Sequence, residues 1–88
     1  MTNKCKRAES AVLDIIDEYG RATQMNGPFN SAHEGYAVIL EELDELKQEV
    51  WKKHSERDYS KMWREAVQIG AMALRFMVDV CEEHTRHA

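Results

Sequence analysis

Proline and glycine are scarce in this chain of 88 residues, which contains one Pro and four Gly. Both residues disfavour the interior of a helix, so their scarcity leaves room for long uninterrupted helices. Strict alternation of polar and apolar residues, which would predict β-strands, is missing as well. These absences argue against a turn-rich β architecture and favour an all-α fold.

Cysteine and long apolar runs are also rare. The two cysteines, Cys5 and Cys81, lie far apart in the sequence, and two thiols in a reducing cytosol are favoured over a disulfide, which stays open as an alternative. The N-terminal residues lead into Cys5-Lys6-Arg7 rather than into an apolar signal core, and the uncharged run 66–74 is too short to span a bilayer. We therefore expect a soluble, cytoplasmic protein that has no membrane partner.

Basic residues are outnumbered by acidic ones, 12 Lys and Arg against 16 Asp and Glu, and the net charge is -4. A nucleic-acid polymer would need a basic face, so this balance argues against such a partner. An acidic protein that handles anionic nucleotides would need a metal ion between the two. The length corresponds to a single domain, residues 1–88.

Apolar residues recur at helical spacing in three stretches, which predict helices at about 3–19, 31–53 and 60–83. Gly20 is the expected end of the first helix, and Asn26-Gly27-Pro28 predicts a turn within the loop 21–30. Ser31 to Glu34 fits a capping box at the start of the second helix. We expect an antiparallel helical bundle of three main helices.

The third predicted helix is apolar nearly all round. One stripe comprises Met62, Ala66, Ile69, Ala73, Phe76 and Val80, and Leu74, Met77, Val78 and Cys81 widen it. A helix of this kind is buried on several sides, and a chain this short can hardly cover it alone. The sequence therefore predicts that a homodimer or homotetramer completes the bundle, with Gly70 and its neighbouring alanines allowing close approach of another helix.

Acidic residues are concentrated in the second predicted helix, at Glu41, Glu42 and Glu45. In the third, Glu65 directly precedes the nearly continuous apolar run that begins at Ala66. Two antiparallel helices can bring Glu42, Glu45 and Glu65 together. Converging carboxylates repel one another and need a cation, usually Mg²⁺ or Mn²⁺, which is typical of a phosphate-handling site. The alternative is a solvated acidic face, with Glu65 paired to Lys61.

The spacing of these acids resembles a known signature. Glu41-Glu42-x-x-Glu45, then nineteen residues, then Glu65 and the polar Gln68, is similar to the Glu-Glu-x-x-Glu and Glu-x-x-Asp motifs of the MazG-like all-α nucleoside triphosphate pyrophosphohydrolases. The resemblance implies a four-helix-type core completed by oligomerisation. It also implies a Mg²⁺-dependent enzyme whose substrate is a nucleoside triphosphate and whose products are the monophosphate and pyrophosphate.

The resemblance also implies roles for individual residues. Glu42, Glu45 and Glu65 would be metal ligands, and Glu41 would complete the catalytic set by serving a second metal or orienting the attacking water. Gln68 occupies the fourth metal position, where the family has Asp; its amide oxygen can coordinate a metal but brings no negative charge. The alternative function is a non-catalytic binding or assembly protein with a degenerate metal site, and a plain helical adaptor with an acidic face is a third.

Three further residues are weaker candidates for substrate contacts, namely Asn30, His33 and Arg75. Asn30 lies in the loop before the second helix, where turn chemistry explains it as well. His33 lies at the start of that helix, where a cap or surface role is the default. Arg75 could meet a phosphate, although an ion pair with Asp79 four residues on is the more ordinary role.

Overall fold

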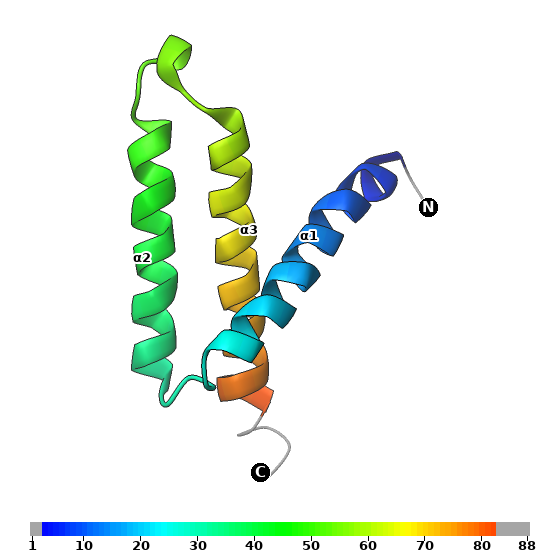
Figure 1. The fold of residues 1–88 in the computed structure, drawn as a ribbon, viewed down its shortest axis with the longest axis vertical. Coiled ribbons are helices and arrows are strands. Elements are labelled where there is room, and N and C mark those ends of the chain that lie inside the picture. The colour runs from blue at the N-terminus through cyan, green and yellow to red at the C-terminus, as the bar shows by residue number, and fades with distance from the viewer. Residues whose placement is uncertain (1–2, 83–88) are drawn as a thin grey trace.

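The computed structural model describes residues 3–82. Its elements, in chain order, are α1 (Asn3–Met25), α2 (Ala32–Val50), the short 3₁₀ turn η1 (His54–Glu56), α3 (Tyr59–Phe76) and the π-helical segment η2 (Met77–Glu82), which continues α3. The helices α2 and α3 lie side by side and antiparallel, and α1 packs against the lower part of α3 and diverges from it toward the N-terminus (Figure 1). The described residues contain no strand, so the predicted all-α class and three packed helices are confirmed.

The first helix is longer than the sequence predicts, because Gly20 does not end it. The backbone at Gly20 has no positive φ, and a Cβ added there would meet nothing within 4 Å. Ala22, two residues later, is buried in the core, and its burial stabilises continuation of the helix past Gly20. The predicted loop 21–30 is thus wrong in its first half, and residues 26–31 make the connection to α2.

The start of α2 is capped as predicted in one half of the expected box. The Glu34 backbone N–H donates to Ser31 Oγ at 3.1 Å. The Glu34 carboxylate accepts from the Asn30 backbone N–H at 3.0 Å and from Asn30 Nδ2 at 3.1 Å, so its bonds reach one residue further back than a capping box requires. Glu34 therefore ties the connecting segment to the first turn of α2.

The turn between α2 and α3 is built around Glu49, which is only 1% exposed. Its Oε1 accepts the Asp58 backbone N–H at 2.7 Å, and its Oε2 lies 3.0 Å from Lys52 Nζ. Asp58 in turn caps α3 by accepting the Lys61 backbone N–H at 3.1 Å. These contacts draw the chain back toward α3, which explains why α2 ends at Val50 and not at the predicted residue 53.

The packed core lies where α1 crosses α3. Among the described residues its buried apolar members are Ala22, Phe29, Ala71 and Met72. Contact between the two helices is close at Gly70, where an added Cβ would lie 2.8 Å from Ile15 Cδ1. The close approach expected at Gly70 is therefore made, within the chain, by α1. None of the described helices combines the length and apolar character needed to cross a membrane.

A candidate metal centre on the charged face

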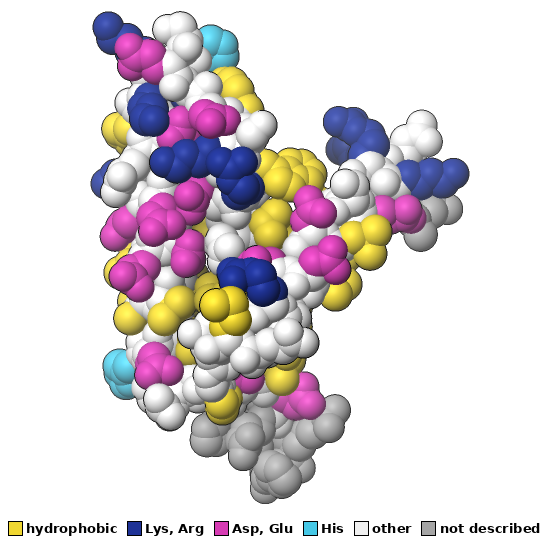
Figure 2. Space-filling model, viewed as in Figure 1, with side chains coloured by type: hydrophobic (Ala, Val, Ile, Leu, Met, Phe, Trp, Pro, Cys, Tyr) yellow, Lys and Arg dark blue, Asp and Glu magenta, His cyan; other side chains and the backbone are white. Residues whose placement is uncertain are grey.

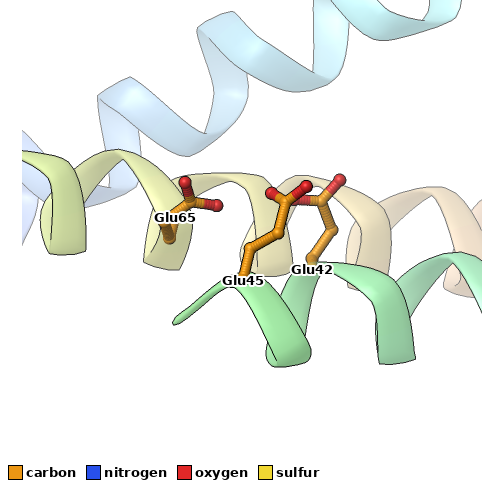
Figure 3. A group of neighbouring side chains, drawn as sticks. All are labelled: Glu42, Glu45 and Glu65. Atoms are coloured by element: carbon orange, nitrogen blue, oxygen red, sulfur yellow. The ribbon is translucent and has the colours of Figure 1, made fainter. Parts of the chain in front are cut away.

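Three carboxylates converge between α2 and α3. Glu42 and Glu45 lie one turn apart on α2, and the antiparallel α3 places Glu65 opposite them. One carboxylate oxygen from each residue lies within 4.8 Å of the other two. Figure 3 shows the three side chains rising on the same side of the helix pair, with their carboxylates turned toward a common point. The convergence expected from the spacing of these acids is present.

The cluster is electrostatically unfavourable without a cation. Partial burial, followed by the charges of Glu45 and Glu65, raises the pKa of Glu42 to about 6. Burial also raises the pKa of Glu65, as do the hydrogen bond and charge of Glu45, while Lys61 and Arg64 partly offset the effect. Two of the three members therefore resist ionisation, as expected of partly buried carboxylates that are held close to like charges.

Glu41 stands beside this cluster and outside it. Its side chain is exposed, and its charge contributes to raising the pKa of Glu42, so it lies within electrostatic reach of the site. Glu49, which shares the acidic side of α2 by helical spacing, is instead enclosed in the α2–α3 turn. Its hydrogen bond from Asp58 is the main reason that the pKa of Glu49 is lowered. Glu41, Glu42 and Glu45 of α2 therefore lie among like charges, whereas Glu49 stabilises the turn to α3.

Gln68 follows Glu65 by one helical turn and lies at the side of α3 that meets α1. A hydrogen bond from Gln68 lowers the pKa of Glu18, although the bond from Arg21 is the larger cause and burial opposes both. The resemblance expects a negatively charged metal ligand at this position. The structure instead places a neutral amide whose partner belongs to α1.

A groove of about 330 Å³ lies between α1 and α3 at this point. Its lining comprises Asp14, Asp17, Glu18, Arg21, Trp63, Arg64, Val67 and Gln68. Trp63 Nε1 donates to Asp14 Oδ2 at 2.8 Å and so links the two walls. Charged side chains gather on this face of the molecule, around the carboxylates and the groove (Figure 2). Of these residues only Gln68 is predicted from the sequence to belong to a site, because acids and bases at helical spacing on α1 are equally typical of a solvated face.

The weaker substrate candidates lie elsewhere. Asn30 and Arg75 line a second hollow, of about 380 Å³, and Arg75 is roughly 15 Å from Glu65 along the axis of α3. Arg75 is buried, donates from Nη2 to the Gly27 carbonyl at 2.7 Å and places its Nε 4.0 Å from Asp79 Oδ2. The expected ion pair with Asp79 is confirmed.

His33 is exposed in the first turn of α2, roughly 13 Å along that helix from Glu42. The structure thus brings none of Asn30, His33 and Arg75 to the three carboxylates. Their assignment as substrate-binding residues stays a prediction.

The residues present at the cluster fit a hard divalent cation. All three donors are carboxylate oxygens, which suit Mg²⁺ and Mn²⁺, and within residues 3–82 no histidine or cysteine joins the group to favour Zn²⁺. Ligand oxygens around Mg²⁺ lie about 3 to 4 Å apart when its bond lengths are about 2.1 Å. The three oxygens lie within 4.8 Å of one another, so a metal ion would have to draw them slightly closer.

Comparison with known proteins adds no relative. A scan against protein-family models, a search of curated proteins and a search of solved structures each return no match. The resemblance to the MazG-like family is therefore carried by the pattern of acids in the sequence, and the chemistry of the site must be argued from its own geometry.

Proposed function

We propose that this protein is a Mg²⁺- or Mn²⁺-dependent pyrophosphohydrolase that converts a nucleoside triphosphate, of either sugar type, to the monophosphate and pyrophosphate. The observation that carries the proposal is the convergence of Glu42, Glu45 and Glu65 from two antiparallel helices. The family resemblance supplies the reaction, and the cytoplasmic location expected from the sequence agrees with such a substrate. In this proposal Glu42, Glu45 and Glu65 hold the metal.

The chemistry needs little beyond the acidic side chains. A bound divalent cation supplies charge neutralisation at the phosphates and lowers the pKa of a bound water. In this proposal Glu41, whose side chain is exposed beside the cluster, would orient the attacking water and accept its proton. Hydrolysis breaks the anhydride bond between the α- and β-phosphates, and the oxygen of that water becomes part of one of the two products.

The groove between α1 and α3 offers a place for the rest of the nucleotide. Gln68, one turn from Glu65, belongs to its lining, so the groove adjoins the carboxylate cluster. Arg21 and Arg64 supply positive charge for phosphate oxygens, and the Trp63 ring supplies an apolar face for a base. A volume of about 330 Å³ is at the lower end of small-molecule sites.

A second candidate function is a non-catalytic nucleotide-binding or assembly protein. The observation that favours it is Gln68, a neutral residue hydrogen-bonded toward Glu18 in the position where the resembled family has a charged ligand. Such a site would have three carboxylates for the metal and weaker affinity for it. The two functions differ in one outcome, because the second predicts nucleotide binding without product formation.

Pyrophosphate release from a panel of canonical and modified nucleoside triphosphates tests the proposal, with Mg²⁺, with Mn²⁺ and with EDTA. We expect metal-dependent release with the monophosphate as the second product, and a loss of roughly 100-fold or more in Glu42→Gln and Glu45→Gln. Asp44→Asn, an exposed carboxylate of the same helix outside the cluster, is the matched control and should keep full activity. Full activity in both glutamate variants, or activity in EDTA, would refute the site. Nucleotide binding without release would favour the second function.

A further inference from the structure

Basic residues are distributed unevenly along the chain. Residues 47–64, which form the end of α2, η1 and the first turns of α3, contain six of the 12 Lys and Arg but only three of the 16 Asp and Glu. Figure 2 shows several Lys and Arg side chains gathered over this end of the helix pair, beyond the acidic side chains. The net charge of -4 is an average over the whole chain, so it does not argue against a nucleic-acid partner at this end.

Three of these cations form one surface at the start of α3. Lys52 and Lys61, both about half exposed, lie 3.0 Å and 3.8 Å from the same oxygen of the buried Glu49, so their ammonium groups are close together. Arg64 is exposed one turn along α3 from Lys61 and is therefore its neighbour on the helix surface. The carboxylate of Glu49 is enclosed in the turn, whereas the three cations remain accessible to a ligand.

Two aromatic side chains lie beside these cations and are held by hydrogen bonds outside the packed core. Tyr59 is 54% exposed and Trp63 is 46% exposed. Trp63 Nε1 donates to Asp14 Oδ2 at 2.8 Å, and the Tyr59 hydroxyl lies 3.1 Å from His54 Nδ1. A ring that is already fixed at the surface loses little conformational entropy when a planar ligand stacks on it.

Both rings border a hollow of about 410 Å³ at the start of α3, whose lining is Tyr59, Ser60, Trp63 and Arg64. Trp63 and Arg64 also line the groove between α1 and α3, so the hollow and the groove adjoin at these two side chains. Aromatic rings for bases and a guanidinium for phosphate are the groups that bind single-stranded nucleic acids. Two adjoining depressions at one tryptophan suit consecutive nucleotides of one strand.

We propose that the surface formed by Lys52, Tyr59, Lys61, Trp63 and Arg64 binds single-stranded nucleic acid. Bases stack on the two rings, and the three cations contact the phosphates. A duplex fits less well, because its bases are already stacked on one another. A lipid surface is a poorer occupant, because residues 51–64 contain no leucine, isoleucine or phenylalanine to enter the acyl boundary. The inference does not depend on the proposed hydrolysis.

Fluorescence anisotropy of labelled oligo(dT) and oligo(rU) of about 15 nucleotides tests the proposal, in EDTA and with salt varied upward from about 50 mM. We expect saturable binding whose affinity falls with salt with a double-logarithmic slope of about -2, because three cations displace counterions from a single strand. Trp63→Ala should weaken binding about tenfold or more and leave this slope unchanged. Lys61→Ala should instead reduce the slope by about 0.7.

Two matched controls lie away from this surface. Tyr36 is an exposed aromatic residue near the start of α2, and Lys6 is an exposed lysine near the start of α1. Tyr36→Ala and Lys6→Ala should bind the strands like the wild type. Because EDTA removes any metal at the three carboxylates, binding can persist where hydrolysis fails, and hydrolysis can persist where strand binding fails.

A second measurement covers the case in which Trp63→Ala fails to fold after losing its bond to Asp14. In Trp51→Phe the only tryptophan is Trp63, and stacking of a base should quench its fluorescence as the strand is added.

No binding of either strand in about 50 mM salt, no quenching of Trp63 on binding, or binding that Lys61→Ala and a folded Trp63→Ala leave unchanged would overturn the proposal. Equal affinity for a mononucleotide and for the strand would also overturn it, because the hollow would then hold a single nucleotide. The same holds for a protein that binds phosphatidylserine vesicles through these residues and does not bind the strands.

Discussion

Glu42 and Glu49 lie two turns apart on the same side of α2, yet their surroundings have opposite effects on their charge. Glu42 is partly buried and faces Glu45 and Glu65, and these surroundings raise its pKa to about 6. Glu49 accepts the Asp58 N–H and is paired with Lys52, and its pKa is lowered. Ionised Glu42 is repelled by its acidic neighbours, and a cation would relieve that repulsion. Ionised Glu49 instead stabilises the fold.

Removing the charge of Glu42 should stabilise the metal-free protein. The folded-state pKa is about 6 and the ordinary value is 4.5, so the ionised carboxylate opposes folding above about pH 6 and has no such effect below about pH 4.5. We expect Glu42→Gln to raise the free energy of unfolding by about 0.5–1 kcal/mol at neutral pH in EDTA, which is less than the full pKa shift implies because solvent screens this partly exposed group.

Urea denaturation measures this change in the free energy of unfolding. Asp44→Asn, exposed on the same helix, should change it by less than about 0.5 kcal/mol. A Glu42→Gln variant that is less stable than the wild type in EDTA would show that the carboxylates do not repel one another as the geometry requires.

Removing the charge of Glu49 should have the opposite effect. Its lowered pKa means that the ionised form contributes stability above pH 4.5, and that this contribution is lost as the pH falls through the folded-state pKa. We expect Glu49→Gln to lower the melting temperature by about 5–10 °C at neutral pH, because the hydrogen bond from the Asp58 N–H and the pairing with Lys52 are weakened.

Circular dichroism melts at neutral and strongly acidic pH distinguish this role from simple packing. The difference between Glu49→Gln and the wild type should shrink as the pH falls from 4.5 through the lowered folded-state pKa, because the wild-type carboxylate also becomes protonated there. Gln48→Ala, at the exposed neighbouring position, should melt like the wild type. A deficit that stays constant down to low pH would mean that the charge of Glu49 is not the stabilising feature.

At the scale of the elements, two glycines in helices should respond oppositely to an added side chain. An added Cβ meets nothing within 4 Å at Gly20, so Gly20→Ala should stabilise α1 by about 0.5–1 kcal/mol through helix propensity. At Gly70 the Cβ already lies 2.8 Å from Ile15 Cδ1, so Gly70→Val should push α1 away from α3.

Thermal unfolding and amide hydrogen exchange of α1 check both changes. Gly70→Val should lower the melting temperature and the protection of α1, and the added substitution Ile15→Ala should restore part of both by making room. A stable Gly70→Val protein with a fully protected α1 would contradict the close helix contact described here.

The existence of the three helices could be predicted from the sequence, because the 3.6-residue periodicity of apolar residues is a local signal. Their ends could not, because contacts distant in the sequence decide them. Ala22 continues α1 past Gly20 by packing into the core, and Glu49 ends α2 early by binding Asp58 across the turn.

The candidate site, like the fold, could be predicted only in part from the sequence. Glu42, Glu45 and Glu65 could be placed together from spacing on two antiparallel helices, which is a matter of helical geometry. The groove depends on the angle at which α1 crosses α3, and the partner of Gln68 depends on the same angle. No pattern within a single helix encodes that angle, so the sequence could not reveal the contribution of α1.

At the scale of the whole molecule, large apolar side chains are exposed on all three helices, and three carboxylates converge between α2 and α3. Both features are unfavourable in the isolated chain, because like charges repel at the carboxylates and apolar side chains contact water elsewhere. The stability of the whole protein should therefore depend on a cation at the three carboxylates.

Divalent cation should raise the melting temperature in a pH-dependent way. At about 100 times its dissociation constant a ligand that binds only the folded state adds about 2.7 kcal/mol, which corresponds to about 10 °C or more for a domain of this size. Glu42 must lose its proton to bind a metal, and its pKa is about 6. The rise produced by Mg²⁺ or Mn²⁺ should thus be full at about pH 7.5 and should fade as the pH drops through 6.

The control for this effect is Glu45→Gln, which removes one proposed ligand and should lose the metal-induced rise at every pH. Leu40→Glu instead changes an exposed apolar residue of α2 and should keep the rise from its own baseline. Differential scanning calorimetry of the wild type and these two variants, with EDTA and with metal, measures the rise in each. A cation bound at the three carboxylates must compete with the proton on Glu42. If the melting temperature rises equally at pH 5 and pH 7.5, or if the rise survives in Glu45→Gln, the cation binds elsewhere.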